Sequence, residues 1–115
     1  MEILVVDDNI DSAEGLADVL ELEGHHVKMV HDGRKAVEAY QHKHFDLVFM
    51  DLKMPHMDGV EATRLIKESD HNAHVIVVTG NTVLEDIDAV MALGIDALLR
   101  KPFDVNDLIN LIPHA

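Results

Sequence analysis

Residues Glu2 to Asn9 read EILVVDDN, an unbroken apolar run from Ile3 to Val6 that stops at two adjacent aspartates. A short apolar run without alternation is typical of a strand buried on both faces of a parallel sheet. Taken alone, Asp7 and Asp8 fit a solvated turn or a helix cap as well as a binding site. Their meaning therefore depends on what stands at the ends of the other strands.

Similar runs recur along the chain, and the predicted strands are Ile3–Val6, Val27–Val30, Leu47–Met50, Val75–Val78 and Ala97–Leu99. Between them, helical spacing and capping residues predict helices over about Ser12–Glu23 and Arg34–His42, from Asp58, from Thr82 to near Gly94, and over Asp104–Leu111. Five strand–helix units in alternation predict an α/β fold, a doubly wound five-stranded parallel sheet with helices on both faces.

Two of the predicted helices open with a capping-box pattern. Asp58 is followed by Glu61, and Thr82 is followed by Glu85, each three residues on. The apolar face predicted for the fourth helix consists of Val83, Leu84, Ile87, Val90 and Met91.

Composition limits the class of protein. The 115 residues fit one domain, residues 1–115, and 48% of them are apolar, enough for a core. The formal charge of −13 argues against direct binding of nucleic acid or of an anionic membrane. The absence of cysteine excludes disulfides and thiol chemistry. We see no segment able to insert into a membrane and no secretory signal, so a cytoplasmic protein is expected.

Polar residues stand directly after four of the five predicted strands: Asp7 and Asp8, Asp51, Thr79, and Lys101. Ligands of doubly wound sheets bind outside the carboxyl ends of the strands, so these groups are expected to meet. Three crowded carboxylates stay ionised only if cations share the site, and hard oxygen ligands favour Mg²⁺. The set indicates Mg²⁺-assisted phosphoryl transfer with an aspartate as nucleophile.

The motifs LVVDDN, DLVFMDLKMPHMDG, VIVVTG and LLRKPF resemble those of the receiver domains of two-component response regulators, in order and spacing over essentially the whole chain. The resemblance implies a flavodoxin-like (βα)5 fold with strand order 2-1-3-4-5. It implies a switch rather than a turnover enzyme, because the domain catalyses only its own phosphorylation and dephosphorylation.

Carried over position by position, the resemblance assigns a role to each residue of the set. Asp51 is the phosphoacceptor. The metal site comprises Asp8, Asp51 and the backbone carbonyl of Lys53, with Asp7 positioning metal-bound water. Thr79 binds the phosphoryl group and Lys101 pairs with one of its oxygens, next to a Lys101–Pro102 bond expected to be cis.

The resemblance also predicts how the signal leaves the site. Thr79 and Lys101 are drawn to the phosphoryl group, which biases a surface formed by the fourth helix, the fifth strand and the fifth helix. Leu98 replaces the aromatic residue that the family often has three residues before the lysine. Two further positions, Lys53 and Asn81, are expected to tune phosphoryl lifetime. Our hypothesis is that Lys53 shields the acyl phosphate and makes its decay slow.

The expected partners are a histidine kinase or a histidine phosphotransfer protein as donor, and a protein target or an output domain. The chain is expected to be a stand-alone receiver or one cut from a larger hybrid kinase or regulator. Two alternatives stay open. One is a pseudo-receiver that binds partners without phosphorylation, which the intact site argues against. The other is a phosphatase of the haloacid dehalogenase type, which needs an aspartate where this chain has Lys53.

Other patterns are interpreted as structural. The segment from Asp7 lacks the glycine and the glutamate of an EF-hand loop, having Ser12 and Asp18 in their places. The nine histidines are interpreted as surface residues. Leu98, Val105 and Ile109 are interpreted as core packing, with a partner surface as the alternative.

Overall fold

Five parallel strands form one sheet in the computed structural model, which describes residues 1–54, 57–80 and 84–112. The strands are β1 (Glu2–Val6), β2 (His26–Val30), β3 (Leu47–Met50), β4 (Val75–Thr79) and β5 (Ala97–Arg100). Their order across the sheet is β2-β1-β3-β4-β5, and every neighbouring pair runs parallel. The predicted fold class and the strand order implied by the family resemblance are confirmed.

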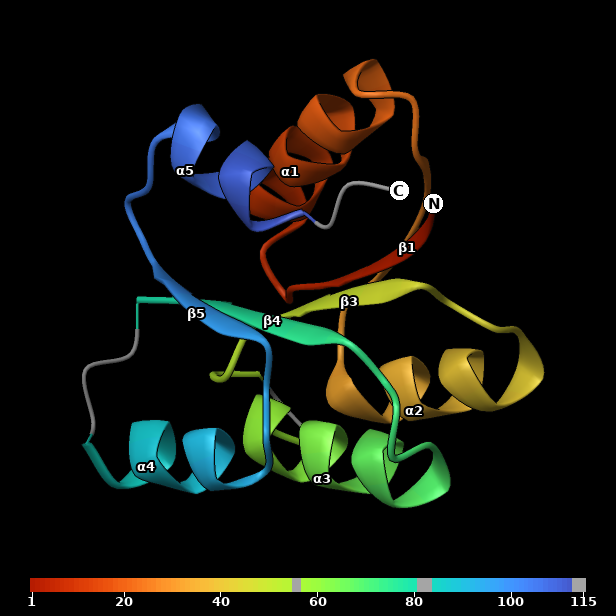
Figure 1. Ribbon diagram of the computed structural model, residues 1–115, viewed down its shortest axis with the longest axis vertical. Coiled ribbons are helices and arrows are strands. Elements are labelled where there is room, and N and C mark those ends of the chain that lie inside the picture. The colour runs from red at the N-terminus through yellow and green to blue at the C-terminus, as the bar shows by residue number, and fades with distance from the viewer. Residues whose placement is uncertain (55–56, 81–83, 113–115) are drawn as a thin grey trace.

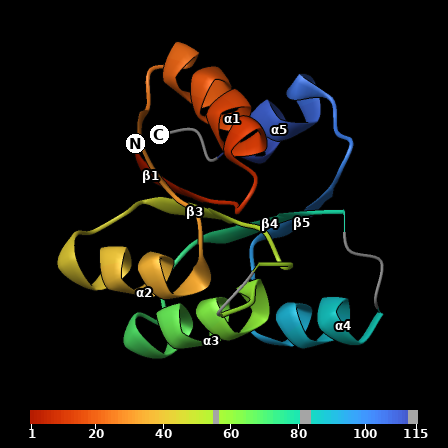
Figure 2. The same cartoon turned by 180° about the vertical axis from the view of Figure 1, so that it is seen from behind.

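Helices alternate with the strands and cover both faces of the sheet. They are α1 (Ile10–Leu22), α2 (Gly33–His42), α3 (Gly59–Ser69), α4 (Leu84–Ala92) and α5 (Val105–Leu111). Figures 1 and 2 show α1 and α5 on one face of the sheet and α2, α3 and α4 on the other. This is the layered, doubly wound arrangement that right-handed strand–helix–strand crossovers produce.

Two hydrophobic clusters fill the layers on either side of the sheet. Successive side chains of a strand point to opposite faces, so Ile3 and Val5 enter one cluster while Leu4 and Val6 enter the other. The first cluster includes Leu20 of α1 and Leu108 of α5, and both are fully buried. Apolar burial on both faces explains why the strands read as continuous apolar runs.

Helix boundaries follow the caps more closely than the apolar periodicity. α1 begins two residues before the predicted Ser12, because the side chain of Asn9 accepts a hydrogen bond from the Ser12 N–H and caps the helix. Asp58 caps α3 as predicted and accepts from the Glu61 N–H at 2.9 Å. The predicted cap at Thr82, with Asn81 and Val83 beside it, lies outside the described residues.

Two sequence predictions about burial are wrong. Strand β2 is largely exposed rather than buried on both faces, because it is an edge strand with one neighbour. The apolar face assigned to α4 is only half buried: Ile87 and Val90 pack inward, whereas Leu84 and Met91 are 70% and 53% exposed. The buried face predicted from periodicity was too wide. Positions at the border of an apolar stripe cannot be assigned to core or solvent without knowing where the sheet lies.

Strand register determines which side chains meet at the carboxyl edge. Val6 is aligned with Met50 across the β1–β3 pair, so Asp7 and Asp51 follow at the same level. Backbone hydrogen bonds extend the ladder past both strand ends, from the Asp51 N–H to the Val6 carbonyl at 2.9 Å and from the Asp7 N–H to the Val30 carbonyl at 3.2 Å. Within the described residues, no helix is long and apolar enough to cross a membrane.

Candidate functional site

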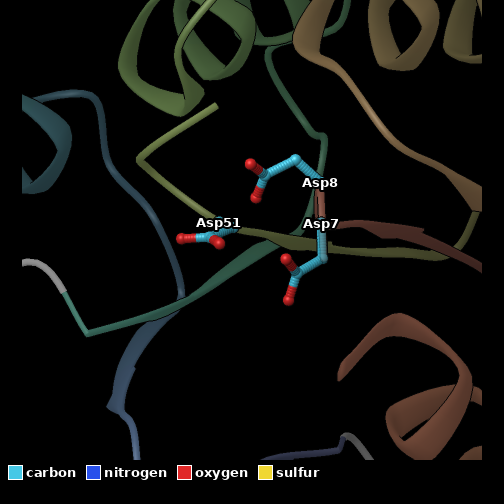
Figure 3. A group of neighbouring side chains, drawn as sticks. All are labelled: Asp7, Asp8 and Asp51. Carbon is cyan, nitrogen blue, oxygen red and sulfur yellow. The ribbon is translucent and has the colours of Figure 1, made fainter. Parts of the chain in front are cut away.

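Three carboxylates converge at the ends of β1 and β3 (Figure 3). Asp7, Asp8 and Asp51 each offer one oxygen, and these oxygens all lie within 4.8 Å of one another. Asp7 and Asp51 are 6% and 8% exposed, while Asp8 is exposed. The cluster therefore has a buried floor and one carboxylate at the rim, open to an incoming cation.

Lys101 supplies the positive charge inside this cluster. Its Nζ donates to Asp7 Oδ2 at 2.9 Å and lies 3.5 Å from Asp51 Oδ2. The residue follows β5, where its N–H donates to the Thr79 carbonyl at 3.0 Å, and the Lys101–Pro102 peptide bond is cis, as the resemblance implied. The ammonium thus comes from a strand two places away in the sheet, across β4 from β3.

Electrostatics shows that one lysine does not neutralise the cluster. Burial raises the pKa of Asp51, the positive charge of Lys101 opposes this, and the negative charge of Asp7 adds to it. Burial acts to lower the pKa of Lys101, but its hydrogen bond to Asp7 and the charges of Asp51 and Asp7 raise it. A divalent cation would relieve the remaining repulsion, and an all-oxygen donor set suits Mg²⁺, so the residues present fit that ion.

The remaining predicted site residues line the same cavity of about 460 Å³. Thr79 ends β4 with a buried side chain, next to Gly80 at the cavity wall. Lys53 stands at the rim, with an exposed side chain, and a hydrogen bond from its backbone helps to stabilise the Asp51 carboxylate. All six predicted residues, Asp7, Asp8, Asp51, Lys53, Thr79 and Lys101, therefore line one cavity.

Sequence reasoning missed three residues that shape the site. Asn9 donates its N–H to Asp7 Oδ1 at 3.0 Å while its side chain caps α1. A Cβ at Gly59 would collide with the Asp51 carbonyl and lie 2.7 Å from the Leu52 Cα, so only glycine fits there. Asp86 of α4 approaches the ammonium of Lys53 to 3.8 Å. Asn9 could have been identified from the sequence as the helix cap that follows the strand. The roles of Gly59 and Asp86 depend on the folded geometry.

The three residues interpreted as core packing, with a partner surface as the alternative, differ in their exposure. Val105 is exposed at the start of α5, Leu98 packs against the core while partly exposed, and Ile109 is half-buried. Interpreting Val105 as core packing was wrong, because its side chain is exposed at the first position of α5. Leu84 and Met91 of α4 are exposed as well.

Comparison with known proteins shows which family the chain belongs to. The family model of the response regulator receiver domain matches residues 3–113. The chain belongs to this family. The chemotaxis protein CheY of Halobacterium salinarum is 36% identical over 111 residues, which span 96% of this chain and 92% of that one. Receiver domains are signalling modules of two-component systems rather than enzymes in general.

Larger proteins also contain similar segments. The CAI-1 autoinducer sensor kinase/phosphatase CqsS of Vibrio cholerae is 36% identical over 113 residues, which are 96% of this chain and 16% of that protein. For the next two curated relatives, the chain spans 18% and 6% of their length.

A solved receiver domain bears on the metal. The receiver domain of the sensor histidine kinase PA1611 from Pseudomonas aeruginosa is 30% identical with a TM-score of 0.88, covering 96% of this chain and 92% of that one. It was solved with a magnesium ion coordinated in its active site cleft. In this chain, the acidic cluster of Asp7, Asp8 and Asp51 is the group of described residues able to hold such an ion.

Proposed function

We propose that residues 1–115 form a phosphoacceptor receiver domain in the cytoplasm, which takes a phosphoryl group on Asp51 from a histidine kinase or a histidine phosphotransfer protein. The observation that carries this proposal is the position of the Lys101 ammonium between two buried carboxylates at the strand ends, 2.9 Å from Asp7 and 3.5 Å from Asp51. Asp8, Asp51 and the Lys53 carbonyl would hold Mg²⁺, with Asp7 orienting bound water.

The chemistry follows from the charges of the site. A carboxylate oxygen of Asp51 attacks the phosphorus, and the bond from phosphorus to the donor imidazole nitrogen breaks as the acyl phosphate forms. Phosphoryl transfer demands positioning and charge neutralisation rather than acid–base chemistry from the protein. Bound Mg²⁺ would offset negative charge on the phosphoryl oxygens. Lys101 can pair with one of these oxygens, and the Thr79 hydroxyl can donate to another.

The same groups can transmit the change. Phosphorylation adds strong acceptor oxygens beside Thr79, the last residue of β4, and Lys101, which follows β5, and so draws both strand ends towards Asp51. The α4, β5 and α5 side of the molecule, with exposed Leu84, Met91 and Val105, is the surface we expect to respond and to meet a target protein or output domain. Leu98 leaves this response without the aromatic reporter frequent in the family.

Intact mass after incubation with Mg²⁺ and acetyl phosphate tests the proposal. We expect a labile gain of one phosphoryl group in the wild type and in Asp46→Asn, a control at the opposite end of the sheet. We expect no gain in Asp51→Asn or when Mg²⁺ is chelated. If none of the proteins gains mass, the test is repeated with phosphorylated histidine kinases and phosphotransfer proteins as donors. Continued absence would favour the pseudo-receiver, whereas steady release of phosphate from simple phosphate esters would favour the phosphatase.

A further inference from the structure

One ion pair joins the rim of the phosphoacceptor cavity to helix α4. Lys53 stands two residues after Asp51, and its Nζ lies 3.8 Å from Oδ2 of Asp86 in the first turn of α4. In the part of the chain that the structure describes, Asp86 is the acid that Lys53 pairs with, although Lys53 lines the same cavity as three other carboxylates. The Lys53 ammonium is therefore directed towards α4 rather than towards Asp7, Asp8 and Asp51.

This arrangement separates the two lysines of the site. Lys101 is partly buried and contacts Asp7 and Asp51 directly, so its position is determined by the cluster itself. The Lys53 side chain is 68% exposed, so it has room to change rotamer, and its partner Asp86 belongs to α4. The side chain is long enough to reach over Asp51, so its position depends on which anion attracts it more strongly.

We propose that Asp86 is a positioning residue that holds the Lys53 ammonium on α4 and away from the Asp51 phosphoryl group, and thereby shortens the lifetime of the acyl phosphate. The inference rests on the proposed function, because it concerns the phosphorylated form of Asp51. It assigns a role to a residue that the sequence did not single out and revises the expectation that Lys53 simply shields the phosphoryl group.

Competition between two anions for one cation is the physical basis. When Asp51 is phosphorylated, the phosphoryl oxygens and Asp86 both attract Lys53, and its time over the phosphoryl group falls as Asp86 holds it more strongly. A side chain over the phosphoryl group blocks the in-line path of water. If the ammonium instead stabilised the charge of the transition state more than it blocked water, Asp86→Asn would speed the decay and the inference would be wrong. The coupling is reciprocal, so phosphorylation must also loosen the Lys53–Asp86 contact and release the first turn of α4.

The test is the first-order decay of the phosphorylated protein, followed by intact mass after acetyl phosphate is removed at constant Mg²⁺. The variants are Asp86→Asn, Lys53→Ala, the double variant, and Asp88→Asn as a control that removes a neighbouring exposed charge of α4. We expect Asp86→Asn to slow the decay about two- to fivefold, the range that an exposed ion pair can contribute. In the Lys53→Ala background, Asp86→Asn should have no effect, and Asp88→Asn should decay as the wild type does.

Other outcomes overturn the inference. These are an unchanged rate in Asp86→Asn, equal slowing in Asp88→Asn, or slowing that persists without Lys53. Should the wild type accept no phosphoryl group from any donor, the proposed function fails by itself. Urea unfolding of the wild type, Asp86→Asn, Lys53→Ala and the double variant then examines the contact separately. A non-zero coupling between Lys53 and Asp86 in unfolding free energy would then show that the ion pair forms, but that it has no role in phosphoryl lifetime. Zero coupling would reject both.

Discussion

The two ends of the sheet use acidic residues in opposite ways. At the carboxyl end, Asp7 and Asp51 are buried together with Lys101 as their shared cation. At the amino end, the acids are more exposed, and each lies within ion-pair distance of a cationic or titratable partner, namely Glu2 with Lys43, Asp46 with His44, and Asp96 with His74. The carboxyl end concentrates negative charge around one cation, while the amino end disperses it among several partners.

The pKa shifts of single acids reveal the difference. Burial raises the pKa of Asp51, so this group contributes stability at low pH that is lost as pH rises through its folded-state value. A hydrogen bond from the Glu2 backbone N–H, at 2.8 Å, lowers the pKa of Asp46. Asp46 therefore contributes stability at neutral pH that is lost as pH falls through its lowered value. At neutral pH the ionised Asp51 therefore destabilises the carboxyl end of the sheet, whereas the ionised Asp46 stabilises the amino end.

Backbone contacts differ between the ends as well, and this predicts the largest effect. Gly59→Ala places a Cβ against the backbone of Asp51 and Leu52, and we expect a loss of about 3 kcal/mol in unfolding free energy together with loss of phosphorylation. Gly94, at the amino end, has a φ of 81° but open space around it, so Gly94→Ala should lose only about 1 kcal/mol. Urea unfolding measures both, and equal losses would contradict the close contact at Gly59.

Removing a cation should matter far more at the carboxyl end. Lys101→Met leaves Asp7 and Asp51 without their shared partner, and we expect a loss of about 2 kcal/mol at pH 7, partly recovered by adding Mg²⁺. The matched change at the amino end, Lys43→Met, removes an exposed partner of Glu2 and should lose less than about 1 kcal/mol. Thermal unfolding with and without Mg²⁺ measures this difference. A Lys101→Met protein as stable as Lys43→Met would show that the carboxyl end is not strained.

Removing an acid from the carboxyl end should stabilise the protein. Asp51→Asn removes the proposed phosphoacceptor and relieves the repulsion from Asp7, and we expect a gain of about 1 kcal/mol in unfolding free energy at pH 7 without Mg²⁺. Because the pKa of Asp51 is raised, the gain should shrink as pH falls from 7 to 4, where the wild-type carboxyl becomes protonated. Unfolding curves across this pH range provide the measurement. A gain that is independent of pH would point to packing rather than charge as its cause.

The same substitution at the amino end should have the opposite sign and the smallest size. Asp46→Asn keeps an oxygen that can accept from the Glu2 N–H but loses its charge, and we expect a loss of about 0.5 kcal/mol at pH 7. The loss should persist through the ordinary carboxyl range and vanish only below the lowered pKa of Asp46, where the wild-type carboxyl is protonated. The unfolding series used for Asp51→Asn measures it when extended to lower pH. A stabilising effect at pH 7 would show that negative charge is in excess at both ends.

Much of the site was predictable because its parts are local signals. Asp7, Asp51 and Thr79 each stand directly after an apolar run, Asp8 and Lys101 come one residue later, and parallel strands bring their carboxyl ends to one edge. The wrong predictions concerned burial, which depends on neighbouring elements: β2 at the sheet edge and Leu84 and Met91 on α4 were expected to be buried and are exposed. A periodic pattern shows that a face is apolar, but not which part of it another element covers.

The amino-acid sequence by itself determined the α/β fold, the alternation of elements and the set of polar groups at one edge, because strand periodicity, caps and strand ends are encoded within a few neighbouring residues. Only the tertiary structure decided that Lys101 bridges Asp7 and Asp51, that Gly59 has no room for a side chain, and that Lys53 pairs with Asp86. These contacts join residues of different elements, and their distances follow from strand register and helix packing, which no local stretch of sequence specifies.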